Sequence, residues 1–171
     1  MNKSELFIKN SLSILKDHII FCGSYALKTQ GMITRTCGDY DIIMDESKFK
    51  LISFQWIEFI EWCYKSSSES NMYITEIHTC RFKDNSKIDF IIRSDFKDLK
   101  VNMCKGLFDN SKMLDPISIV KEKINLIEKN HNKEKHMHDI INIMQNLLPD
   151  SQKYTMEDFK NIGKTTTSWY M

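Results

Sequence analysis

The chain of 171 residues is 42% hydrophobic and carries a formal net charge of +1, which suits one globular domain and gives no sign of a broad nucleic-acid-binding surface. Its five cysteines form no C-x-x-C pair, which argues against a zinc ribbon or a dithiol redox motif and favours reduced thiols in the cytoplasm. No window approaches the roughly 18 apolar residues of a membrane span, and we expect a cytoplasmic protein without a membrane segment.

Helices and short strands alternate in the first part of the chain. Apolar residues at helical spacing predict a helix near the start, and a short apolar run predicts a buried strand that ends at Gly23-Ser24. Gly31 suits the C-terminal cap of the next helix, and a polar, irregular loop follows over 32–38. The predicted elements are a helix over 6–15, a strand over 19–22, a helix over 25–30, a strand over 40–44, and a helix capped by Ser47 that reaches Tyr64.

A β-hairpin is predicted after that long helix. Strand-like alternation over 72–82 and an apolar run over 88–93 flank the turn residues 83–87. The stretch 95–112 contains several breakers and predicts no regular element.

Two helices are predicted to close the core. Pro116 suits the first turn of one of them, after Asp115 as its cap, and the other ends before Pro149. Their predicted apolar stripes are Ile117, Val120, Ile124 and Ile127 on the first, and Met137, Ile140, Ile141, Met144, Leu147 and Leu148 on the second. We therefore expect one domain over 1–150, which includes these helices, and a peripheral tail over 151–171.

The Gly23-Ser24 pair lies where a predicted strand gives way to a helix. Backbone N–H groups at such a point can bind an anion, and glycine lets a phosphate come close. The alternative is ordinary cap chemistry at a strand-to-helix turn.

Three aspartates form the strongest chemical signal in the sequence. Asp39 and Asp41 are two apart on one predicted strand, so their side chains share a face, and two like charges there favour a cation between them. Asp89 is the single acid in an otherwise apolar strand and needs a partner when buried. The alternatives are solvated side chains for the first pair and a salt bridge to lysine for Asp89. Together the three suit one or two Mg²⁺ ions that position a nucleoside triphosphate.

These motifs together resemble the nucleotidyltransferase superfamily that includes DNA polymerase β and the minimal nucleotidyltransferases. The shared pattern is Gly23-Ser24-x-Ala26-Leu27, then Arg35-x-x-x-Asp39-x-Asp41-Ile42, then Ile88-Asp89-Phe90. Within the superfamily the sequence is most similar to the abortive-infection and type IV toxin branch. The resemblance to this branch extends to the C-terminal part of the chain, at Met113-Leu114-x-Pro116, Lys123 and Lys135-His136-x-x-Asp139-Ile140. The resemblance implies an α/β (α+β) fold with a small mixed sheet flanked by helices, and further C-terminal helices.

The resemblance also implies roles for individual residues. Gly23 and Ser24 would hold the β- and γ-phosphates, Asp39 and Asp41 would ligate Mg²⁺, and Asp89 would complete the metal site and help to deprotonate the attacking hydroxyl. Further roles fall to Lys123, which would neutralise triphosphate charge, to Asp139, which would support the site or the acceptor, and to Arg35, which would reach a phosphate unless it is a solvent-facing loop residue.

The function expected from this pattern is Mg²⁺-dependent transfer of an NMP from an NTP to an acceptor hydroxyl, with release of pyrophosphate. The acceptor would be an RNA 3′ end, a protein side chain or a small molecule, and a toxin-like member would have a cognate antitoxin or regulatory protein. The alternatives are a non-catalytic binding module that acts through a protein partner, and a nucleic-acid-binding protein without chemistry.

Overall fold

The computed structural model describes residues 1–52, 60–66, 73–129 and 133–147. The chain divides into two compact units, Met1–Asp115 and Pro116–Met171, and each is described by itself. Within the described ranges no helix is both long enough and apolar enough to cross a bilayer.

The described strands of the N-terminal unit form one seven-stranded mixed sheet in the order β3-β4-β5-β2-β1-β7-β6. The pairs β2–β5 and β1–β7 are parallel, and the other neighbours are antiparallel. The strands are β1 (Ile20–Cys22), β2 (Asp39–Met44), β3 (Ile60–Ser66), β4 (Ile74–Phe82), β5 (Lys87–Arg93), β6 (Val101–Cys104) and β7 (Ser111–Leu114). This mixed sheet with flanking helices confirms the predicted α/β class.

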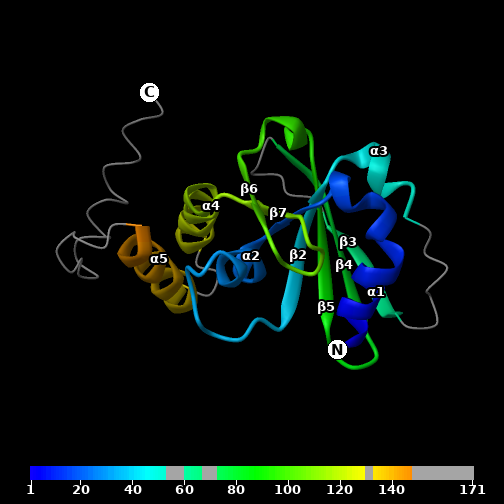
Figure 1. Ribbon diagram of the computed structural model, residues 1–171, viewed down its shortest axis with the longest axis horizontal. Helices are drawn as coiled ribbons and strands as arrows, with labels where there is room; N and C mark the ends of the chain where they lie inside the picture. Colours follow the sequence, from blue (N-terminus) through cyan, green and yellow to red (C-terminus); the bar gives the residue numbers. More distant parts are fainter. Residues whose placement is uncertain (53–59, 67–72, 130–132, 148–171) are drawn as a thin grey trace. The chain divides into compact units, whose positions relative to one another are not determined.

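Helices lie on both sides of this sheet, with α1 (Lys3–Ser11) and α3 (Glu46–Phe49) against one face and α2 (Gly23–Thr29) on the other (Figure 1). Two short 3-10 helices, η1 (Ser13–His18) and η3 (Phe96–Asp98), complete the unit. The first helix of the chain is thus an α-helix followed by a 3-10 turn, where the sequence predicts one continuous helix over 6–15.

The core between the sheet and α1 and α3 is built on aromatic rings. The ring of Phe7 on α1 lies 5.6 Å from that of Phe82 and 6.5 Å from that of Phe90. Phe49 on α3 lies 5.6 Å from Phe90. Because side chains alternate along a strand, Phe90 fixes which face of β5 is covered, and Asp89 points to the opposite face.

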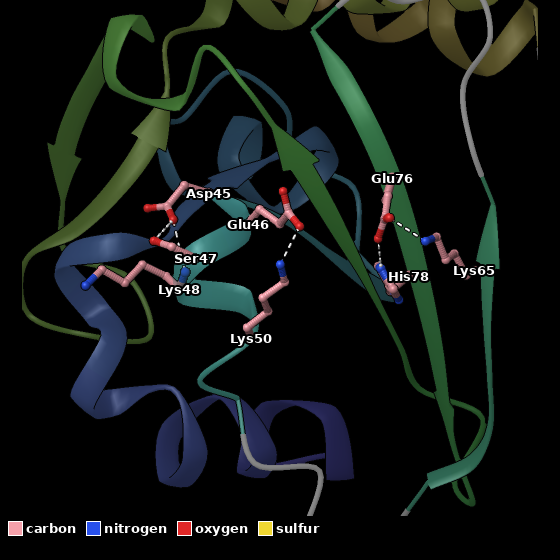
Figure 2. Close-up of polar contacts among 8 residues, drawn as sticks. All are labelled: Asp45, Glu46, Ser47, Lys48, Lys50, Lys65, Glu76 and His78. Carbon is pink, nitrogen blue, oxygen red and sulfur yellow. Dashed lines mark hydrogen bonds and ion pairs between the residues drawn. The ribbon is translucent and has the colours of Figure 1, made fainter.

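The start of α3 shows why the predicted long helix over 47–64 is wrong. Asp45, not Ser47, is the N-cap, and its carboxylate accepts a hydrogen bond from Lys48 N at 3.0 Å (Figure 2). The helix ends at Phe49, and 60–66 forms β3, while 53–59 lies outside the described residues. Within 60–66, Ile60, Trp62 and Tyr64 recur at every second position as in a strand, and pairing with β4 decides the outcome.

Strands β3 and β4 are joined by a cross-strand polar cluster. Lys65 on β3 is the register partner of His78 on β4. Glu76, on the same face of β4, forms an ion pair with Lys65, and its carboxylate lies 2.7 Å from Nε2 of His78 (Figure 2). The ring of His78 also lies 4.4 Å from that of Phe49. This cluster therefore links the edge of the sheet to the helix that covers it.

The C-terminal unit contains α4 (Pro116–Glu128) and α5 (Lys133–Leu147), which pack against each other. Pro116 opens α4 as predicted. The predicted stripe of α4 is shifted, because Ile119 and Val120 are buried whereas Ile117 is 46% exposed. On α5 the buried residues include Met137 and Ile140 of the predicted stripe, and also Ile143, which the prediction omitted. The predicted tail over 151–171 lies outside the described residues.

Candidate functional site

Three central strands of the sheet meet at the end where β1 stops and where β2 and β5 begin. Asp41 on β2 is the register partner of Cys22 at the end of β1 and of Asp89 on the parallel strand β5. Register partners on adjacent strands share a face, as do residues two apart on one strand. Asp39, Asp41 and Asp89 therefore lie on the same face, opposite the one covered by α1 and α3.

Gly23 lies directly against this carboxylate group. It has φ +59, and a Cβ at this position would stand 1.9 Å from Oδ2 of Asp41. Two independent constraints thus select glycine, the left-handed backbone and the absence of room for a side chain. The turn that the sequence predicts at Gly23-Ser24 is the first part of α2 itself.

The loop over 32–38 is tied to the start of α2 by a hydrogen bond. Arg35 donates from Nη2 to the hydroxyl oxygen of Ser24 at 2.5 Å, and both side chains are half-buried. The alternative prediction for Arg35, a loop arginine that faces solvent, is therefore wrong. A guanidinium and a hydroxyl beside a glycine form a group of donors suited to an anionic ligand.

Asp89 is engaged on both carboxylate oxygens. Thr79 Oγ1 on β4 donates to Oδ1 at 2.6 Å, and Lys87 Nζ lies 2.9 Å from Oδ2. The same ammonium lies 3.7 Å from Oδ2 of Asp39, which is half exposed. Burial lowers the pKa of Lys87, but the hydrogen bond to Asp89 and the charges of Asp89, Asp39 and Asp41 outweigh it, so the pKa is raised overall.

The donor set fits a hard divalent cation in chemistry and in backbone register. Carboxylate oxygens on neighbouring strands are ligands that Mg²⁺ accepts. The side chains, however, are turned toward their protein partners, and across the described part of the chain no three acidic, histidine or cysteine side chains converge on a common point. A metal ion bound to Asp89 would compete with its present contacts to Thr79 and Lys87.

Lys123 and Asp139 lie in the C-terminal unit, on α4 and α5. They form an ion pair with Nζ 2.9 Å from Oδ2, and their side chains are 6% and 0% exposed. The ammonium also lies 3.4 Å from Nδ1 of His136. Lys123 and Asp139 therefore contact each other. Their roles toward a triphosphate and an acceptor remain predictions.

Sequence reasoning missed Thr79 and did not name Lys87, although the salt bridge from Asp89 to a lysine, its alternative for this residue, is present in the structure. Lys87 could have been found, because a lysine two positions before Asp89 on a strand must share its face. Thr79 could not, because its place beside Asp89 depends on the register of the β4–β5 hairpin.

No family model matches the sequence, and no curated protein matches it. Solved structures do. The chain superposes on a Thermotoga maritima protein assigned to the nucleotidyltransferases with a TM-score of 0.53 at 17% identity, covering 81% of this chain and 96% of that one. It superposes on the antibiotic-resistance factor ANT(2'')-Ia with a TM-score of 0.59 at 9% identity, covering 98% and 91%.

A third likeness is to the lincosamide antibiotic adenylyltransferase LnuA, solved with lincomycin bound. The TM-score is 0.53 at 12% identity, with coverage of 84% of this chain and 96% of that one. Identities this low establish the fold and leave the chemistry to be argued from the residues. The protein therefore has the nucleotidyltransferase fold.

Proposed function

We propose that this protein is a Mg²⁺-dependent nucleotidyltransferase, which moves an NMP from an NTP to an acceptor hydroxyl and releases pyrophosphate. The observation that carries the proposal is the register of Asp41 with Asp89, with Gly23 packed against the Asp41 carboxylate. Three carboxylates and a close-approach glycine thus lie on one face of the central strands, in a chain whose fold is that of nucleotidyltransferases.

In this reaction the acceptor oxygen attacks the α-phosphorus, and the bond from that phosphorus to the bridging oxygen breaks. Asp89 accepts the acceptor proton, because it is the carboxylate held in place by Thr79. Gly23 leaves room for the β- and γ-phosphates, which Ser24 and Arg35 bind. Mg²⁺ held by Asp39, Asp41 and Asp89 would neutralise the phosphate charge and align the reactants.

Lys123 and Asp139 are assigned a supporting role in the same reaction. Lys123 would neutralise triphosphate charge and Asp139 would support the site or the acceptor, as the resemblance implies. The ammonium is bound to Asp139, lies near His136 and is almost fully buried, so a triphosphate must gain access to it before it can bind.

The acceptor is either a macromolecule or a small molecule. The resemblance to the toxin branch favours an RNA 3′ end or a protein side chain, with a cognate antitoxin or regulatory protein as partner. The likeness to the lincosamide antibiotic adenylyltransferase LnuA supports the remaining acceptor class, a small molecule.

The test is transfer of label from each NTP carrying radioactive phosphorus at the α-position, with Mg²⁺ and with total RNA, total protein or a small-molecule extract as acceptor. Wild-type protein should label one acceptor class, and Asp41→Asn should abolish labelling. Label transfer that is undiminished in Asp41→Asn would show that these aspartates do not form the active site.

A non-catalytic binding module is the second candidate. It is favoured by the contacts of Asp89, whose two oxygens are both occupied by Thr79 and Lys87. Calorimetry with Mg²⁺ and each NTP separates the two, because the module should bind neither while remaining folded.

A further inference from the structure

The side chain of Lys87 lies among the aspartates of the candidate site. Its ammonium is 2.9 Å from Asp89 and 3.7 Å from Asp39. Lys87 is also the direct register partner of Asp39 across the β2–β5 pair. The ammonium is therefore a cation held between the two strands that carry the carboxylates.

The contacts of Asp89 leave no carboxylate oxygen without a donor. Oδ1 accepts from the neutral hydroxyl of Thr79, and Oδ2 faces the ammonium of Lys87. A divalent cation needs at least one of these oxygens, and it meets a like charge at Lys87 if that side chain stays. Metal entry therefore competes with the Lys87–Asp89 contact, because the two cations share one carboxylate and repel each other.

From this geometry we propose that Lys87 is a positioning residue that competes with the divalent metal for Asp89 and Asp39. This inference rests on the proposed function and deepens it, since it concerns the loading of the same site. Metal alone binds weakly because it must displace the ammonium. Metal that arrives with a triphosphate binds more readily, because the phosphates add ligands and negative charge.

Binding of Mn²⁺ in the absence of nucleotide tests the proposal, with free Mn²⁺ measured by electron paramagnetic resonance. Lys87→Met should bind Mn²⁺ about five- to tenfold more tightly than wild type, the range expected for removing one partly buried ion pair. Lys87→Arg should bind as weakly as wild type, because the charge is kept. The side chain of Lys87 is 32% exposed, and thermal unfolding monitored by circular dichroism checks that each variant folds.

The matched control is Lys83→Met. Lys83 is an exposed lysine in the turn of the same hairpin, so this variant changes net charge equally. A gain in Lys83→Met equal to that in Lys87→Met would overturn the proposal, because it would trace the effect to overall charge.

The two levels of inference fail differently. Equal affinity in Lys87→Met and wild type, with binding lost in Asp41→Asn, overturns the role of Lys87 and keeps the metal site. Absence of Mn²⁺ binding in every variant, with or without an NTP, overturns the proposed function and this inference together.

Discussion

Substitution of Gly23 by alanine should damage both the fold and the site. A Cβ would stand 1.9 Å from Oδ2 of Asp41, where ordinary contact begins near 3.4 Å, so the carboxylate would have to retreat by about 1.5 Å. The left-handed backbone adds about 1 kcal/mol for alanine, and overpacking adds about 1–3 kcal/mol. We expect the free energy of unfolding to fall by about 2–4 kcal/mol in urea denaturation.

The effect of this substitution on activity should exceed its effect on stability. Displacement of a reacting group by about 1 Å can cost about 100-fold in rate. Label transfer by folded Gly23→Ala protein, assayed well below its unfolding midpoint, should therefore fall by about that factor.

Two other glycines distinguish the effect of the left-handed backbone from the effect of the steric contact with Asp41. Gly31 has φ +74 but nothing within 4 Å of a Cβ, and Gly38 has no contact within 4 Å either. Gly31→Ala should lose about 1 kcal/mol of stability from the backbone alone and keep full activity. Gly38→Ala should change neither. If Gly23→Ala behaved like Gly31→Ala in both assays, the proposed contact between Gly23 and Asp41 would be refuted.

Two further predictions concern buried titratable groups. Lys123→Ala should leave the carboxylate of Asp139 buried without its cation and reduce the free energy of unfolding by about 3–5 kcal/mol. In the same urea titration, substitution of the exposed Lys121 by alanine should change the free energy of unfolding by less than about 0.5 kcal/mol. Equally small losses in the two variants would contradict the pairing of Lys123 with Asp139. Burial, with smaller contributions from the charges of Glu5, Tyr25 and Cys37, raises the pKa of Tyr40 to about 12. The folded state thus favours the neutral phenol, so the stability from Tyr40 is present below about pH 10 and is lost as the pH rises toward 12. Urea unfolding across this range should show a shallower decline in Tyr40→Phe, and an unchanged decline would exclude this contribution.

The strands that carry the aspartates were predictable because their signals are local. Asp39-x-Asp41 and Asp89 stand in short apolar runs whose strand character needs no tertiary information. Their convergence followed from the resemblance to a known superfamily, since spacing alone does not tell which strands are neighbours. The parallel pairing of β2 with β5 is what places Asp41 beside Asp89.

The missed elements depend on pairing. Strands β6 and β7 are short and lie in a stretch with several turn residues, so neither periodicity nor composition predicts them. The pattern at 60–66 fits two kinds of element, and only a partner strand distinguishes them. The burial of Lys123 was equally hidden, because a lysine at helical spacing is usually a solvated residue.

The turn between β4 and β5 has a consequence for the whole site. Asn85 adopts φ 66, a left-handed conformation that asparagine tolerates, and its N–H bonds the carbonyl of Phe82. This turn fixes the hairpin register, and a slip of one residue would exchange Asp89 for an apolar neighbour on the site face. A surface turn without any reacting group therefore determines whether the third carboxylate faces the other two or the hydrophobic core.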